Sequence, residues 1–126
     1  MSIPNQLRYT RTHEWVRLEG DCAVVGITDH AQNELTDIVY VEPPHVGDTV
    51  EAGRECAVVE SVKTASDIYA PVSGEVVATN PALGDHPELL NQDPYGKGWL
   101  FKIKMADPSQ ADDLLTADEY AHHIGE

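Results

Sequence analysis

A single lysine stands in the middle of a valine-rich stretch of the chain, VVESVKTASDIYAPVSGEV at residues 58–76. This residue, Lys63, lies between two runs that are typical of β-strands, CAVVES before it and SDIYAP after it. The intervening VKTA lacks the Gly or Asn of a very tight turn, so we expect an antiparallel hairpin with Lys63 at or near its tip. Nothing in the sequence indicates burial of this amine, which favours a lysine that a modifying enzyme acts on over a Schiff-base or general-base lysine.

Histidine and cysteine are the other residues whose spacing bears on chemistry. The six histidines show no metal-ligand spacing, and the adjacent His122 and His123 have side chains that diverge on a helix. Cys22 and Cys56 are isolated in apolar, strand-like surroundings, without the spacing of a zinc site or a redox pair. We therefore expect no metal site and two buried free thiols in a reducing compartment.

Short apolar runs that are rich in β-branched residues recur along the chain between glycine and proline residues. The runs are EWVRLEGDCAVVGI, DIVYVEPPHVGDTV, ECAVVESV, SDIYAPVSGEVVATN and GWLFKIKM. Turn sequences such as EGD, VGD and SGE separate the strands, because their residues tolerate positive φ or hydrogen-bond their own backbone. This rhythm predicts a mainly β chain folded as a small sandwich or barrel, in which two strands carry the hairpin of Lys63.

A short helix is predicted near residues 29–35, within the sequence ITDHAQNEL. Asp29 is placed to cap this helix, and Gln32, three residues on, reaches back in the arrangement of a capping box. We expect a helix of about two turns.

The C-terminal residues predict a helical segment at about 108–124, after the last strand. Asp107 followed by proline is a typical helix start, and Thr116 with Glu119 repeats the capping pattern before a glycine near the chain end. We therefore expect one broken helix or two short ones. Their apolar side chains would pack on the sheet, namely Leu114, Leu115, Tyr120 and Ile124.

The 126 residues, of which 41% are hydrophobic, predict one domain over residues 1–126 with its core at about 7–105. Eight basic and 22 acidic residues give a formal net charge of -14, which opposes binding to nucleic acid or to anionic membranes. No apolar run approaches the roughly 20 residues of a membrane span, and MSIPNQLRYT lacks the regions of a signal peptide. We expect a cytoplasmic protein, or a mitochondrial matrix protein if the chain is a processed organellar form.

Five segments together resemble one protein family. The stretch ESVKTASDIYAPVSGEV and the segments YTRTHEWVR, VGITDHAQ, DIVYVE and PELLNQDPYGKGW are similar to the H protein of the glycine cleavage system. The resemblance runs from about Leu7 to the C-terminal helix. Biotin carriers usually have methionine on both sides of the lysine, and lipoyl domains of 2-oxoacid dehydrogenases usually have aspartate before it. This chain instead has Val62 and Thr64 beside Lys63.

The resemblance implies a barrel-sandwich hybrid of two small antiparallel sheets, with a protruding hairpin whose Lys63 carries lipoate in amide linkage. It also implies that the lipoylating enzyme recognises Glu60 and Gly74, three residues before and eleven after Lys63. The ordinary alternatives are a solvated strand acid for Glu60 and a turn residue with positive φ for Gly74.

Three further residues are assigned by the resemblance to a cleft that shelters the loaded lipoyl arm, namely Glu14, Asp67 and Thr12. An aminomethyl amine is cationic in water, and acids that surround it would hold it away from solvent. The ordinary alternatives are that Glu14 is a surface acid, that Asp67 is an acid of the hairpin and that Thr12 is a threonine of a strand.

By the same resemblance, the lipoyl group carries the aminomethyl group of glycine between enzymes. The pyridoxal-phosphate-dependent glycine decarboxylase (P protein) loads it, and the tetrahydrofolate-dependent aminomethyltransferase (T protein) receives it. Dihydrolipoyl dehydrogenase (L protein) then reoxidises the dithiol. The chain is thus expected to be a carrier rather than an enzyme, and a monomer, because it must visit several partners.

Three other functions stay open on the sequence. A lipoyl carrier of another pathway, such as a lipoate relay or a protein of sulfur oxidation, would share Lys63. An enzyme that uses Lys63 as a base or Schiff-base former needs a partly neutral amine, which an exposed hairpin opposes. An acidic interaction module would leave Lys63 unmodified. One departure from the family pattern, Thr36 where glycine is usual, questions the local backbone geometry before DIVYVE.

Overall fold

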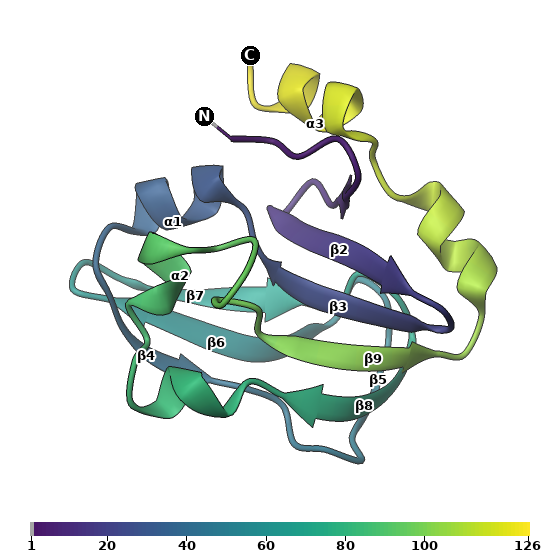
Figure 1. The fold of residues 1–126 in the computed structure, drawn as a ribbon, viewed down its shortest axis with the longest axis horizontal. Coiled ribbons are helices and arrows are strands. Elements are labelled where there is room, and N and C mark those ends of the chain that lie inside the picture. The colour runs from purple at the N-terminus through teal and green to yellow at the C-terminus, as the bar shows by residue number, and fades with distance from the viewer. Residues whose placement is uncertain (1) are drawn as a thin grey trace.

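Two antiparallel β-sheets make up most of the chain in this computed structural model, which describes residues 2–126 (Figure 1). The six-stranded sheet has the order β1-β2-β3-β9-β8-β5, with β1 at Arg8–Tyr9, β2 at Glu14–Glu19, β3 at Cys22–Ile27, β9 at Phe101–Met105, β8 at Gly74–Thr79 and β5 at Thr49–Val50. The three-stranded sheet has the order β4-β6-β7, with β4 at Ile38–Glu42, β6 at Glu55–Ser61 and β7 at Ala65–Tyr69. The sheets are not closed into a barrel, and the prediction of a mainly β chain with two antiparallel sheets is confirmed.

The main hydrophobic core lies between the two sheets, because alternate residues of each strand face inward. In β6, Ala57 and Val59 are buried while their neighbours are partly exposed. Val76 of β8 and Ile103 of β9, from the opposite sheet, belong to the same buried cluster. A second apolar cluster joins the first strands to the C-terminal helix and consists of Leu7, Tyr9, Trp15, Val24, Ala117 and Tyr120.

Helix α1 spans Asp29–Leu35 and confirms the helix that was predicted near residues 29–35. Its N-cap is Thr28, whose hydroxyl accepts a hydrogen bond from the Ala31 backbone N–H (3.2 Å). The prediction that Asp29 is the cap was therefore wrong by one residue. Asp29 lies in the first turn instead, where its carboxylate accepts a hydrogen bond from the Gln32 side chain (2.8 Å).

The remaining helices lie after β8 and after β9. A 3-10 helix η1 (Pro81–Gly84) and helix α2 (Leu89–Gln92) connect these two strands. The predicted C-terminal segment is two short helices, η2 (Pro108–Asp113) and α3 (Ala117–His123), and the capping box of Thr116 at the start of α3 is formed. Figure 1 shows α3 beside the N-terminal segment of the chain.

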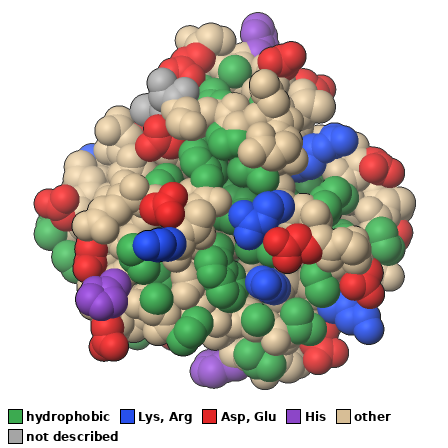
Figure 2. Space-filling view, viewed as in Figure 1, with side chains coloured by type: hydrophobic (Ala, Val, Ile, Leu, Met, Phe, Trp, Pro, Cys, Tyr) green, Lys and Arg blue, Asp and Glu red, His purple; other side chains and the backbone are tan. Residues whose placement is uncertain are grey.

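The face of the molecule in Figure 2 carries acidic, basic and hydrophobic side chains in mixture. On the six-stranded sheet, Glu19 forms ion pairs with Arg17 (3.1 Å) and Lys102 (3.8 Å). These side chains are at least about a third exposed, so the pairs contribute little to the free energy of unfolding. Among residues 2–126, no helix has the length and apolar character needed to cross a membrane.

Thr36 has a backbone conformation that favours glycine, with φ 67° and ψ -146° at the C-cap of α1. Its backbone N–H donates to the Gln32 carbonyl (2.9 Å), and its carbonyl accepts from the Asn91 side chain (2.8 Å). Glycine retains both hydrogen bonds and relieves a strain of about 1–3 kcal/mol, against an unfolded-state entropy cost of about 0.5–1 kcal/mol. We expect Thr36→Gly to raise the free energy of unfolding by about 1 kcal/mol in a denaturant titration.

Thr36→Ala is the matched control for this prediction, because alanine removes the hydroxyl but keeps the Cβ that opposes a positive φ. We expect no gain from alanine. An equal gain in both variants would show that the side chain, and not the backbone conformation, limits stability at this position.

Candidate functional site

The hairpin that was predicted around Lys63 is formed by β6 and β7, with Lys63 in the middle of its connection. Ser61 holds this turn, because its hydroxyl oxygen accepts hydrogen bonds from the backbone N–H groups of Lys63 (3.2 Å) and Thr64 (3.1 Å). The Ser61 N–H donates to the Thr64 carbonyl (2.8 Å), and the Val62 N–H donates to the Asp37 carbonyl (3.0 Å). The backbone at the hairpin tip is therefore fixed by hydrogen bonds, while the lysine side chain projects from it.

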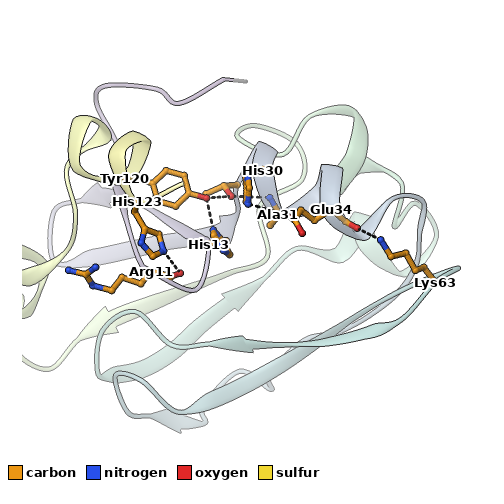
Figure 3. Close-up of polar contacts among 9 residues, drawn as sticks. Arg11, His13, His30, Ala31, Glu34, Lys63, Tyr120 and His123 are labelled. Carbon is orange, nitrogen blue, oxygen red and sulfur yellow. Dashed lines mark hydrogen bonds and ion pairs between the residues drawn. The ribbon is translucent and has the colours of Figure 1, made fainter. Parts of the chain in front are cut away.

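The Lys63 side chain is exposed and reaches toward α1. Its Nζ donates a hydrogen bond to the backbone carbonyl of Glu34 (3.0 Å), in the last turn of that helix (Figure 3). Helix C-terminal carbonyls attract cations, but an exposed contact of this kind is weak. A primary amine in this position is thus open to an enzyme that converts it to an amide.

A cavity of about 200 Å³ lies beside the hairpin, between α1, β7 and the segment before β2. Its polar lining consists of Thr12, His13, His30, Glu34, Ser66 and Asp67. Its apolar lining includes Ile27, Leu35 and Ile68. Because Glu34 belongs both to this lining and to the contact with Lys63, the cavity lies within reach of a side chain extended from the hairpin tip.

Glu14 is buried, with 1% of its surface exposed. One of its carboxylate oxygens accepts hydrogen bonds from the Thr10 and Thr12 hydroxyls, each at 2.5 Å, and the other accepts from the Tyr69 backbone N–H (3.3 Å). Burial raises the pKa of the Glu14 carboxyl above its usual value, because desolvation disfavours the charged form, and these hydrogen bonds oppose part of the rise. The site therefore holds a carboxylate that a nearby cation would stabilise.

The structure brings together the three residues that the resemblance assigned to a cleft. Thr12 and Asp67 both line the cavity and are exposed. Glu14 is not among the lining residues, and it reaches the cavity wall through its hydrogen bond with Thr12. The role of these residues toward a lipoyl arm stays a prediction.

Glu60 and Gly74 lie in different sheets. Glu60 is half-buried near the end of β6, close to the hairpin tip. Gly74 is buried at the start of β8, and it is not among the glycines with positive φ, so the interpretation of Gly74 as a turn residue with positive φ was wrong. A Cβ at this position would lie 2.1 Å from the Lys104 carbonyl oxygen. The close approach of β9, and not a turn conformation, requires glycine here.

The histidines beside the cavity were not predicted from the sequence. The half-buried ring of His13 lies between the rings of His30 and His123, at centroid distances of 4.7 and 5.9 Å (Figure 3). His13 Nδ1 is 2.8 Å from the Tyr120 hydroxyl. No spacing rule relates these residues, because three separate segments supply them. Within residues 2–126, no group of three His, Cys, Asp or Glu is arranged to hold a metal ion.

Comparison with known proteins identifies the family. A profile of the glycine cleavage H-protein family matches residues 7–126. The glycine cleavage system H protein of Acinetobacter baumannii is 59% identical over 120 residues, which are 95% of this chain and 97% of that protein. The corresponding protein of Thermus thermophilus is 60% identical over 120 residues, which are 95% and 94% of the two chains. The crystal structure of a glycine cleavage system H protein from Mycobacterium marinum matches with a TM-score of 0.91 and 44% identity, over 98% of this chain and 100% of that one. This chain therefore belongs to the glycine cleavage H-protein family.

Proposed function

We propose that this chain is the lipoyl carrier of the glycine cleavage system and that lipoate is attached in amide linkage to Lys63. The observation that carries the proposal is an exposed Lys63 at a hairpin tip, with a cavity beside it that contains acidic and apolar groups. Membership of the glycine cleavage H-protein family supports it. When bound, lipoate supplies a dithiol that carries the aminomethyl group of glycine between enzymes.

The residues of the site fit a lipoyl group. Amide formation removes the positive charge of Lys63 and so weakens its hydrogen bond to the Glu34 carbonyl, because the remaining amide N–H is an uncharged donor. The cavity offers Ile27 and Ile68 to a hydrocarbon chain and Asp67 to an amine. A tethered arm is presented to each docked enzyme at high effective concentration.

The acids at the cavity are suited to hold a cationic amine. Asp67 and the Thr12 hydroxyl line the cavity, and Glu14 lies behind Thr12. A cation in the cavity favours the ionised form of Glu14 and so lowers the pKa that burial has raised. An amine held in this way stays protonated and away from bulk water, which slows its loss before the next enzyme accepts it.

The partners follow from the proposed activity. The P protein would load the arm, the T protein would unload it, and the L protein would reoxidise it. A lipoylating enzyme would contact the hairpin, where Glu60 lies close to Lys63. Gly74 remains a candidate for recognition by the same enzyme, and strand packing requires glycine there in addition. We further propose that the chain acts in the cytoplasm as a monomeric, single-domain carrier without catalytic residues of its own.

Mass spectrometry of the protein purified from its own cells tests this function. We expect peptides that cover residues 55–80 to carry a lipoyl mass on Lys63. An unmodified Lys63, in cells whose other lipoyl proteins are modified, would reject the carrier function and favour an acidic interaction module. Lipoylation without exchange of bicarbonate into glycine by the P protein would instead favour a lipoyl carrier of another pathway.

A further inference from the structure

We propose that Tyr120 and Thr28 are positioning residues that hold His13 as a neutral imidazole in the cavity wall, so that the cavity accepts a cationic arm. The inference rests on the proposed function, because the cation is the amine that the lipoyl group would carry. It assigns a role at the lipoyl site to helix α3, which supplies Tyr120.

A chain of hydrogen bonds assigns the protons. The Thr28 hydroxyl oxygen accepts from the Ala31 N–H (3.2 Å) as the N-cap of α1, and it lies 2.7 Å from the Tyr120 hydroxyl. Thr28 is 0% exposed, so its hydroxyl proton needs an acceptor within the protein. Within residues 2–126, the acceptor found for the Thr28 proton is the Tyr120 hydroxyl oxygen. The Tyr120 proton is then donated to His13 Nδ1, at 2.8 Å. His13 Nδ1 is therefore an acceptor, and the neutral ring carries its proton on Nε2.

The backbone holds the His13 ring in this position as well. His13 has φ 76°, a conformation that a residue with a Cβ keeps only when its surroundings impose it. Its N–H donates to the Thr10 carbonyl (3.3 Å), and its carbonyl accepts from the Thr28 N–H (3.0 Å). Thr28 thus contacts His13 through its backbone and, by way of Tyr120, through its side chain.

The surroundings of His13 disfavour a positive charge on its ring. Burial is the largest cause that lowers the pKa of His13 from 6.5, the charges that His30 and His123 can carry lower it further, and Glu34 opposes the shift. His30 is itself paired with Glu34, at 3.0 Å between Nε2 and the carboxylate. The titratable groups that face the His13 site are His30 and Glu34 of α1, Tyr120 and His123 of α3, Asp67 of β7 and Glu14 of β2.

The sign of the pH effect follows from this arrangement. Because the pKa of His13 is lowered, the ring stays neutral above 6.5 and gains its proton only as the pH falls below that value. A protonated His13 Nδ1 can only donate, so the Tyr120 hydroxyl must turn its proton away from His13 and toward Thr28. The Thr28 hydroxyl proton then loses the Tyr120 oxygen as its acceptor. In a cavity of about 200 Å³, the new charge lies within a Debye length of about 8 Å of a bound amine. Acid is therefore expected to expel the cationic arm.

The experiment follows the position of the arm rather than activity. The arm disulfide of the lipoylated protein is first opened to two thiols by a phosphine, which takes up the oxygen of one water as it is oxidised. ¹³C-formaldehyde and ammonium then join to one arm thiol as a protonated aminomethyl thioether and release one water. The ¹³CH₂ chemical shift is recorded between about pH 8 and about pH 5, the range in which histidine titrates. Free aminomethyl dihydrolipoamide, recorded over the same pH range, gives the ¹³CH₂ chemical shift of an arm that is fully in solvent.

In the wild-type protein we expect a cavity-bound ¹³C shift at high pH that becomes solvent-like with a midpoint below pH 6.5. Tyr120→Phe keeps the aromatic ring but removes the donor to His13 Nδ1, so its midpoint should rise by about 0.5 pH unit or more. His13→Asn, chosen because asparagine tolerates positive φ, should lose this pH-dependent change of the ¹³C shift. His45→Asn is the matched control, at a histidine whose side chain is 92% exposed, and should keep the wild-type midpoint.

Amide NMR spectra establish that each variant is folded before the midpoints are compared. A step that persists unchanged in His13→Asn overturns the inference and assigns the titration to another group, while lipoyl carriage by Lys63 stands. An unchanged midpoint in folded Tyr120→Phe overturns the positioning role of α3. A solvent-like shift at every pH in the wild-type protein overturns both the inference and the proposed arm cavity.

Discussion

Lys63→Arg is expected to carry no lipoyl group and to support no glycine cleavage above the rate measured without the carrier. Arginine keeps the positive charge and the length needed to reach the Glu34 carbonyl, which Lys63 contacts at 3.0 Å. Its guanidinium stays protonated throughout the assay range and is not a nucleophile for acyl transfer. Intact-protein mass after incubation with a lipoylating enzyme, followed by glycine cleavage with the P, T and L proteins, measures both losses.

Lys97→Arg is the matched control, because Lys97 is also an exposed lysine in a loop. We expect full lipoylation and full activity from this variant. The free energy of unfolding of Lys63→Arg should lie within about 0.5 kcal/mol of the wild-type value, since the hydrogen bond from the Lys63 side chain to the Glu34 carbonyl is exposed. A lipoyl mass on Lys63→Arg would show that another lysine is the attachment site.

Gly74→Ala is expected to lower the free energy of unfolding by about 3 kcal/mol or more, the upper range for an overpacked site. The new Cβ would lie 2.1 Å from the Lys104 carbonyl oxygen and 2.7 Å from the Ile103 side chain. The clash with Lys104 involves backbone atoms of the neighbouring strand, so β8 and β9 must separate to relieve it. Thermal unfolding should show a fall in Tm of about 10 °C or more.

Gly84→Ala is the control, because a Cβ at Gly84 meets no atom within 4 Å and its φ is not positive. We expect a change of less than about 0.5 kcal/mol. The same pair of variants separates packing from enzyme recognition at Gly74. If Gly74→Ala is folded at low temperature and is lipoylated at the wild-type rate, its role is packing alone. Loss of lipoylation in a stable, folded Gly74→Ala would instead support recognition.

The hairpin around Lys63 was predictable because its signals are local. Two β-branched runs and a short connection without an apolar residue pattern of its own specify adjacent antiparallel strands, and β6 and β7 pair in that way. The capping box of Thr116 and Glu119 was predictable for the same reason, because both partners lie within one helical turn.

Local sequence rules failed where two neighbouring residues could both cap a helix, and where a strand distant in sequence determines which residue fits. Thr28 and Asp29 are both good capping residues, and the end of β3 at Ile27 placed the cap at Thr28. Gly74 follows a serine in a turn-like sequence, yet the approach of Lys104 is what excludes a side chain there. Thr36 was noted as a departure from a family glycine, and the positive φ of its backbone is visible only in the structure.

The sequence by itself determined the main strands, the lysine hairpin, the helix near 29–35, the C-terminal helical segment and the resemblance to a lipoyl carrier, because short-range periodicity, turn chemistry and motif residues encode them. The short helices η1 and α2 between β8 and β9 were not predicted. The tertiary structure alone decided that His13 and His30 line the same cavity as the predicted cleft residues Thr12 and Asp67. Thr12, His30 and Asp67 come from the segment before β2, from α1 and from β7, and Tyr120 reaches His13 from 107 residues away. Such contacts depend on how the sheets and α3 pack, and no local pattern of residues records that packing.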